Sequence, residues 1–264
     1  MSDLLVKARA GRSIVEVTPA SAGWQYVGFS AYRLKRGESI QLDLADREAC
    51  VIVLEGTVSV QAPDVVYREI GERRSVFEER SPYAVYVGAP GAIHVDPHTD
   101  AEVGIATAPA GAKCASRLLE PQQMKRSVRG SGSNRRFICD ILPESEPAAH
   151  LLVVEVRTPS GHSSSYPPHK HDADDSPRES ALEETYYHRI DPSQGFVFQR
   201  VYTDDRSLDE SMAVENRDLV LVPRGYHPVV VPHGYESYYL NVMAGAKRAW
   251  QFRNDPAHEW MLSK

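Results

Sequence analysis

The feature that most constrains this chain's fold is a succession of short apolar or alternating runs, bounded by Gly, Pro, Asp and Ser. Such punctuated runs are typical of an all-β sandwich or barrel, and helix signals are scarce. In the first half, residues 49–60 read as two strands joined at Glu55-Gly56, and 83–87 as another. We expect these strands to form hairpins in one antiparallel unit. In the second half, strands are predicted at 151–156, 195–202, 218–222 and 237–242.

The length of 264 residues exceeds that of a usual single domain, so it favours two domains or one large all-β unit. Residues 129–136 are polar and glycine-rich, lie near the midpoint and form the best linker or long-loop candidate. We therefore predict domains at 1–128 and 129–264, with the connection around 119–145.

The charge balance argues against nucleic acid as a partner. The formal net charge is −6 and the isoelectric point is near 5.9, whereas phosphate recognition needs clustered Lys and Arg. Small molecules or further copies of this chain are the expected partners. The three widely spaced cysteines have neither a C-x-x-C pattern nor disulfide-scaffold density, and we expect them to be reduced. No run matches a signal peptide or membrane span, so we expect a cytoplasmic protein.

A pair of histidines, His169 and His171, is the first functional signal. Side chains at i and i+2 of an extended segment point to the same face, so both imidazoles can reach one metal ion. Two solvated loop histidines would look the same, so other residues must decide. The following acidic run, 172–179, is interpreted mostly as a solvated surface segment.

A third ligand is expected on the next strand, where Glu183 and Glu184 are adjacent and only one can face the interior. Glu184 is favoured because Tyr186 and His188 then share its face and can donate supporting hydrogen bonds. Glu183 remains the alternative.

A fourth ligand is offered by His227, where a strand ends in Pro223-Arg224-Gly225 and the chain turns. Its rival is His233, whose Pro-His-Gly setting looks more exposed. We therefore predict a metal site of His169, His171, Glu184 and His227.

These residues resemble the two short motifs of the cupin superfamily, an H-x-H pair with a following Glu, and a later His after Pro-x-Gly. Cupins are small β-barrels that hold a divalent metal. Here the gap from His171 to Glu184 is longer, and His227 follows the glycine one residue sooner, than in the usual pattern.

Nearly the whole chain resembles a narrower family. That family includes the 5-deoxy-glucuronate isomerases of bacterial myo-inositol breakdown and the 4-deoxy-L-threo-5-hexosulose-uronate ketol-isomerases of pectin degradation. The resemblance rests on these segments: 165–172, 195–203, 223–228, 238–245 and 255–260. It implies an all-β bicupin with a metal in the C-terminal barrel only. The first half agrees, because it has His94 and His98 but no H-x-H pair.

The resemblance also implies a reaction, the conversion of 5-deoxy-D-glucuronate to 5-dehydro-2-deoxy-D-gluconate. One divalent ion, Zn, Mn, Fe, Co or Ni, would act as a Lewis acid on the open-chain sugar. Proton transfer and hydride shift both remain open. The acid/base candidates are Glu184, Asp172 and Tyr186, with His188 also considered.

An anionic substrate should meet Arg or Lys. Arg200 and Arg224 are the leading candidates, and Lys170, between the two histidines, would point to the opposite face from them. Tyr239 and Asn241 share a face and are further candidates for lining the pocket.

Two rival functions remain open at this stage. A histidine-and-carboxylate site also suits a non-haem iron dioxygenase. A sugar-acid-binding protein without turnover is the second rival. The chain is further expected to be able to form a homo-oligomer.

Overall fold

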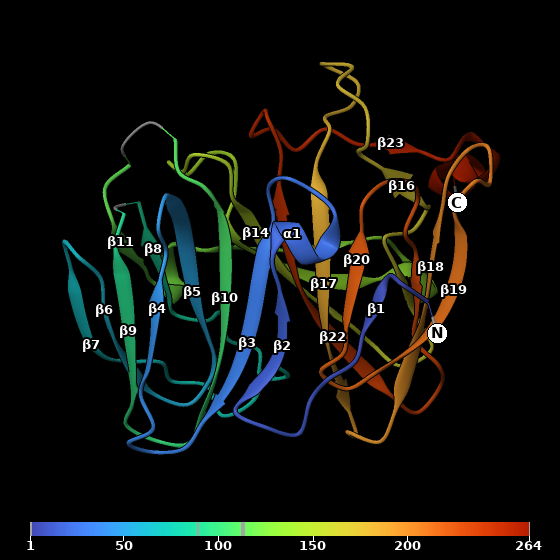
Figure 1. The fold of residues 1–264 in the computed structure, drawn as a ribbon. Helices are drawn as coiled ribbons and strands as arrows, with labels where there is room; N and C mark the ends of the chain where they lie inside the picture. Colours follow the sequence, from blue (N-terminus) through green and yellow to red (C-terminus); the bar gives the residue numbers. More distant parts are fainter. Residues whose placement is uncertain (1, 89, 112–113, 264) are drawn as a thin grey trace. The chain divides into compact units, whose positions relative to one another are not determined.

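The computed structural model describes residues 2–88, 90–111 and 114–263, and it is built mostly of antiparallel strands (Figure 1). Helical segments are few and short: α1 (Pro19–Ala22), η1 (Pro121–Gln123), η2 (Gly132–Asn134) and η3 (Pro256–Ser263). The expectation of a mostly β chain is confirmed. None of the helices in the described part of the chain is both long and apolar enough to cross a bilayer.

The chain divides into two compact units that are discontinuous in sequence. The N-terminal unit comprises Arg9–Arg126 and Cys139–Val154, and the C-terminal unit comprises Met1–Ala8, Ser127–Ile138 and Glu155–Lys264. The single boundary between residues 128 and 129 stays a prediction.

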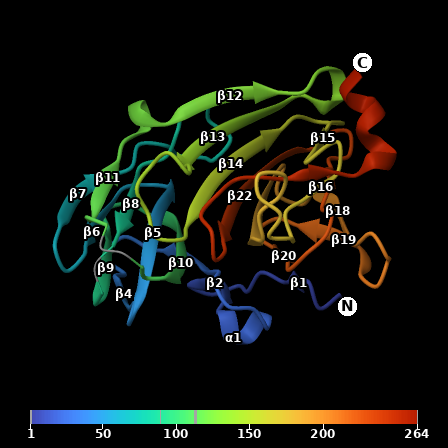
Figure 2. The same ribbon diagram turned by 90° about the horizontal axis from the view of Figure 1, so that it is seen from above.

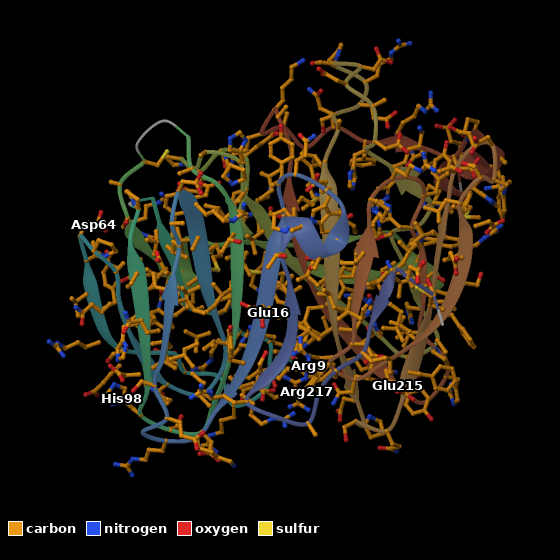
Figure 3. The ribbon with its side chains drawn as sticks, viewed as in Figure 1. Arg9, Glu16, Asp64, His98, Glu215 and Arg217 are labelled. Atoms are coloured by element: carbon orange, nitrogen blue, oxygen red, sulfur yellow. The ribbon has the colours of Figure 1, made fainter. Side chains whose placement is uncertain are left out.

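Two sheets build the N-terminal unit. The six-stranded sheet has the order β11 (Arg117–Leu119), β8 (Ala84–Val87), β5 (Arg47–Glu55), β10 (Ala101–Pro109), β3 (Gly28–Leu34) and β2 (Ser13–Val17). The four-stranded sheet has the order β4 (Ile40–Asp43), β9 (Ala92–Pro97), β6 (Val58–Gln61) and β7 (Val66–Ile70). Buried side chains from both sheets, such as Val51, Val60 and Ile105, form one apolar core. Asp64 and His98 are exposed residues of this unit (Figure 3).

The predicted hairpin at Glu55-Gly56 is wrong. The two strands exist, as β5 and β6, but they belong to different sheets. Gly56 makes the change of sheet possible: it has a φ of 86°, and a Cβ there would lie 2.4 Å from the carbonyl oxygen of Asp100. A strand that turns a corner between packed sheets looks like a hairpin in sequence, because both need a glycine turn.

A seven-stranded sheet carries the residues of interest in the C-terminal unit. Its order is β1 (Leu5–Val6), β20 (Leu219–Val222), β17 (Glu183–Asp191), β22 (Glu236–Ala244), β14 (Leu152–Thr158), β13 (Arg136–Leu142) and β12 (Lys125–Arg129). Figure 2 shows β22, β14, β13 and β12 side by side in that order. The polar segment 129–136 therefore connects two neighbouring strands, β12 and β13.

Two smaller sheets complete the C-terminal unit. One has the order β15 (Ser163–Ser164), β21 (Val229–Val230), β18 (Phe196–Tyr202) and β19 (Asp209–Glu215). The other pairs β16 (His169–Lys170) with β23 (Arg253–Asn254). The strands predicted in the second half of the sequence are thus present as β14, β18, β20 and β22.

Candidate metal centre

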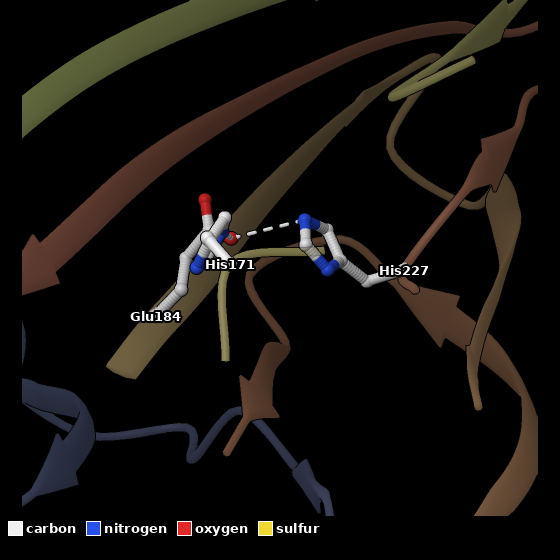
Figure 4. A group of neighbouring side chains, drawn as sticks. All are labelled: His171, Glu184 and His227. Atoms are coloured by element: carbon white, nitrogen blue, oxygen red, sulfur yellow. Dashed lines mark hydrogen bonds and ion pairs between the residues drawn. The ribbon is translucent and has the colours of Figure 1, made fainter. Parts of the chain in front are cut away.

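Three buried side chains of the C-terminal unit bring their ligand atoms together: His171, Glu184 and His227 (Figure 4). One ligand atom from each lies within 4.8 Å of the others. Nε2 of His171 is 3.0 Å from Oε2 of Glu184, and Nε2 of His227 is 3.2 Å from the same oxygen. Two imidazoles and a carboxylate that converge in this way are a donor set for a divalent transition metal.

Backbone carbonyls fix which nitrogen of each imidazole faces this group. Nδ1 of His171 lies 3.2 Å from the carbonyl oxygen of Leu182, and Nδ1 of His227 lies 2.8 Å from that of Gly225. A carbonyl oxygen can only accept, so each Nδ1 carries a proton and donates it. Nε2 is therefore the nitrogen that each ring offers to a metal.

Gly225 allows the chain to turn and present His227. It has a φ of 89°, and a Cβ at this position would lie 2.4 Å from the carbonyl oxygen of Tyr202. Any other residue would be strained and would push this turn away from β18. The Pro-x-Gly signal in the sequence therefore has a direct steric basis.

Glu184 reaches the group because β17 is a central strand, paired with β20 on one side and β22 on the other. It is fully buried, whereas Glu183 is half-buried and lies outside the group. Asn241 of β22 donates a hydrogen bond from Nδ2 to Oε1 of Glu184. Burial opposes ionisation, but His227 and His171 outweigh it and lower the pKa of Glu184. The carboxylate is thus charged and oriented.

The two histidines of the group have opposite pKa shifts. Burial opposes protonation of His171 and is the largest single influence, but the hydrogen bond to Glu184, the charge of Glu184 and backbone hydrogen bonds together outweigh it and raise the pKa of His171. Burial lowers the pKa of His227 to about 4, so this ring is neutral near pH 7. The neutral imidazole is the form of histidine that would hold a metal ion.

His169 lies beside the group. Its ring centroid is 4.9 Å from that of His227 and 6.4 Å from that of His171, but none of its atoms belongs to the set within 4.8 Å. Burial, and then the neighbouring His227 and His171, lower the pKa of His169 well below its usual value. The structure thus brings three of the four predicted ligands together and places the fourth next to them.

Tyr186 and His188 share the face of Glu184, as strand alternation requires. The Tyr186 hydroxyl lies 3.0 Å from Oγ of Ser165, and burial raises the pKa of Tyr186 well above its usual value. Nε2 of His188 lies 2.9 Å from Oε1 of Gln199, and burial lowers the pKa of His188 to about 4. The Tyr186 ring lies 4.8 Å from that of Tyr239. These side chains form a polar interior of neutral groups around Glu184.

Lys170 points away from the histidine group, as predicted, into an ion-pair cluster. Nζ of Lys170 lies 2.6 Å from Asp172 and 3.7 Å from Glu179. Asp172 also accepts a hydrogen bond from the backbone N–H of Gly225, 2.8 Å away. It thereby links the segment of His171 to the turn of His227. The acidic run is exposed from Asp174 to Arg178, but Glu179 is buried, so the expectation of a solvated segment is wrong at that residue.

Arg200, Arg224 and His233 lie apart from the group. Arg200 makes two hydrogen bonds of 2.7 Å with Asp209 at the surface. Arg224 is exposed and its nearest hydrogen-bond partner is Oγ of Ser207, 3.5 Å away. His233 is also exposed. Substrate binding by Arg200 or Arg224 stays a prediction.

No sequence signal assigns a site role to two aromatic residues near the C-terminus, which are expected in a core or an interface. The Phe252 ring lies 4.7 Å from that of His169, and the Trp250 ring lies 6.1 Å from that of His171. Nothing local marks these residues, because aromatic side chains in such segments usually pack in a core or an interface. Their contact with the histidines depends on the pairing of β16 with β23, a long-range feature.

Comparisons with a family model and with curated proteins point to the same family. Residues 4–261 match the KduI/IolB family. The chain belongs to the KduI/IolB family. It is 50% identical to a protein of Geobacillus kaustophilus named 5-deoxy-glucuronate isomerase, over 99% of this chain and 96% of that one. A Bacillus subtilis (strain 168) protein of the same name is 49% identical over 94% of this chain and 92% of its own length.

This KduI/IolB family member has the same fold as two proteins of known structure. An IolB-like protein from Salmonella typhimurium has a TM-score of 0.97 and 47% identity, covering 99% of this chain and 100% of that one. An oxalate decarboxylase of Lactobacillus farciminis has a TM-score of 0.66 at 12% identity, covering 100% of this chain and 91% of its own. The second likeness concerns the fold alone.

Proposed function

We propose that this protein is an aldose-ketose isomerase that converts 5-deoxy-D-glucuronate to 5-dehydro-2-deoxy-D-gluconate in inositol breakdown. The observation that carries the proposal is the near-half identity, over almost the entire length, to relatives named 5-deoxy-glucuronate isomerase. The buried His171-Glu184-His227 group gives that activity a chemical basis within this chain.

The residues of the group fit a divalent metal. Nε2 of His227 is buried and has no hydrogen-bond partner, although it lies 3.2 Å from Glu184 Oε2. A buried nitrogen without a partner is costly, and a cation would satisfy it. His171, Glu184 and His227 would hold the ion, with His169 completing the set. When bound, the ion would supply Lewis-acid polarisation of the carbonyl and hydroxyl oxygens of the sugar.

The remaining side chains of this interior have distinct roles in the proposal. Tyr186 keeps its proton at neutral pH, so its hydroxyl donates a hydrogen bond to a substrate oxygen. Asn241 holds the Glu184 carboxylate in place through Oε1. Asp172 is engaged by Lys170 and Gly225, so it acts as a positioning residue for His171 and His227. Of the three acid/base candidates, we therefore assign Tyr186 the role of a hydrogen-bond donor, because its raised pKa disfavours transfer of the proton near neutral pH.

We further propose that the two units are two cupin barrels and that the metal binds in the C-terminal one. The two sheets around one core in the N-terminal unit, and the fold likeness to an oxalate decarboxylase, support this assignment. The native metal, a homo-oligomeric state and a cytoplasmic location stay predictions.

The test is turnover in deuterated water. Metal-loaded protein is incubated anaerobically with 5-deoxy-D-glucuronate, and the product is followed by NMR. We expect conversion to 5-dehydro-2-deoxy-D-gluconate without oxygen or any electron acceptor. Deuterium in the product indicates proton transfer; its absence indicates a hydride shift or a shielded proton. Saturable binding without product, or turnover only with oxygen, contradicts the isomerase proposal.

A further inference from the structure

Arg136, at the start of β13, is a half-buried cation without an anionic partner. Its Nη1 donates to the backbone oxygen and to Oδ1 of Asn134, at 3.1 and 3.0 Å. Within residues 2–88, 90–111 and 114–263, no carboxylate lies within ion-pair distance of it, and Nε and Nη2 make no hydrogen bond. Leaving a guanidinium partly desolvated and unpaired is unfavourable. Such an arrangement is expected where an anion binds.

The loop before Arg136 is built to hold the guanidinium in place. Gly130 has a φ of 75°, and a Cβ there would lie 2.1 Å from the backbone oxygen of Asn134 and 3.0 Å from Nη1 of Arg136. Asn134 in turn donates from Nδ2 to the carbonyl oxygen of Tyr166, 2.9 Å away. Tyr166 lies three residues before His169. The guanidinium is thus fixed to the segment that carries the histidine pair.

Arg136 acts on the interior that contains Glu184. Burial lowers the pKa of Arg136, and the neighbouring Tyr239 and Tyr186 counteract that effect. Nearby, η2 packs against β15, and the residue after β15, Ser165, bonds to Tyr186. The cation therefore borders the same interior as the candidate metal centre.

We propose that Arg136 binds the carboxylate of the sugar-acid substrate and so selects uronic acids over neutral sugars. This inference rests on the proposed isomerase function. A uronic acid carries its carbonyl at one end and its carboxylate at the other, so it needs a cation at a distance from the metal ligands. The free Nε and Nη2 edge of Arg136 offers the parallel donors that bind a carboxylate in a bidentate manner. Arg200 is already paired with Asp209, and Arg224 is exposed.

The test compares Arg136→Ala and Arg136→Lys with Arg135→Ala. Arg135 is the matched control, because it is the adjacent arginine, is exposed and stacks on the Phe137 ring at 5.3 Å instead. Each variant is assayed with 5-deoxy-D-glucuronate and with the neutral analogue in which the carboxylate is reduced to an alcohol. Metal content and circular dichroism verify that each variant is folded and loaded.

We expect Arg136→Ala to lower kcat/KM for the uronate about 100-fold, mostly through KM, and to change that for the neutral analogue less than about threefold. Arg136→Lys keeps the charge but loses the bidentate geometry, so we expect an intermediate loss of about tenfold. Arg135→Ala should resemble the wild type. An equal loss with both substrates, or no loss with either, overturns the assignment.

A binding measurement separates this inference from the proposed function. The sugar acid with its C1 aldehyde reduced to an alcohol cannot isomerise, and its affinity is measured by calorimetry. If the wild type binds it, and Arg136→Ala but not Arg135→Ala abolishes binding, Arg136 holds the carboxylate even if the wild type shows no turnover. If the wild type isomerises the uronate and Arg136→Ala binds the reduced acid equally well, the inference fails and the proposed function stands.

Discussion

Each unit has a central strand of nine residues, but the N-terminal strand faces an apolar core and the C-terminal strand faces a polar interior. In the N-terminal unit, β5 has nine residues and lies between β8 and β10, and its inward residues Ala49, Val51 and Val53 belong to the apolar core. In the C-terminal unit, β17 also has nine residues and lies between β20 and β22. One face of β17 carries Glu184, Tyr186 and His188, and Glu184 belongs to the candidate metal centre.

This difference shows how two antiparallel units of one chain separate stability from chemistry. Each buried Val or Ile of the N-terminal core contributes about 1.5–3 kcal/mol by leaving water. The polar interior of the C-terminal unit gains less from burial and depends on having every donor and acceptor matched. An interior that retains a buried imidazole without a partner, as at His227 Nε2, is suited to binding a cation.

The largest expected effect comes from removing a ligand of the C-terminal group. His171→Ala or His227→Ala should abolish bound metal and lower turnover at least about 1000-fold, because the Lewis acid is lost. Metal analysis and the isomerase assay measure both. His94→Ala is the matched change in the N-terminal unit, where His94 bonds to Asp96, and it should alter neither. A metal-free His171→Ala variant with normal turnover would refute the site.

Shortening a core side chain in the N-terminal unit should lower stability and leave turnover unchanged. Ile105→Ala is expected to lower the free energy of unfolding of that unit by about 2–5 kcal/mol, since it leaves a cavity in a fully packed core. Urea unfolding followed by circular dichroism measures this. Turnover per folded molecule should stay unchanged. The exposed Val66→Ala, which should stay within about 0.5 kcal/mol, is the control. An Ile105→Ala protein that is as stable as wild type contradicts the proposed division of roles.

A smaller effect is expected from the residue that orients Glu184. Asn241→Ala removes the donor to Oε1, so the metal affinity should fall about 10- to 100-fold, as is usual for residues that hold a metal ligand. Titration against a metal-binding dye gives the affinity. Ser59, which bonds to Nε2 of the exposed His98 at 2.7 Å, is the N-terminal counterpart. If the Asn241→Ala and Ser59→Ala variants bind the metal with equal affinity, Asn241 does not support the metal site.

Strand alternation made much of the C-terminal site predictable. The face shared by Glu184 and Tyr186 and the direction of Lys170 away from the histidine group follow from period-two geometry, and both are found: the Tyr186 ring lies 5.6 Å from that of His227, and Lys170 pairs with Asp172. The turn at Gly225 was readable because it needs a positive φ. Features of this kind depend only on a few residues that are neighbours in the sequence, so the sequence is enough to predict them.

Features that depend on distant pairing could not be predicted. The strands joined at Gly56 belong to separate sheets, and Phe252 reaches His169 through the pairing of β16 with β23. Arg136 lies in a segment that looks like a linker, because its glycines signal flexibility when read alone. In the fold, Gly130 allows a close backbone approach that fixes the guanidinium. Composition does not distinguish these two uses of glycine.

The most direct test of the central claim is a crystal structure of the protein after incubation with Mn²⁺ or Zn²⁺, with anomalous diffraction to locate the ion. We predict one ion in each chain, bound by Nε2 of His171 and His227, by a carboxylate oxygen of Glu184 and by His169, with none in the N-terminal unit. Anomalous density elsewhere, with His171 still hydrogen-bonded to Glu184 and nothing between them and His227, would contradict the account.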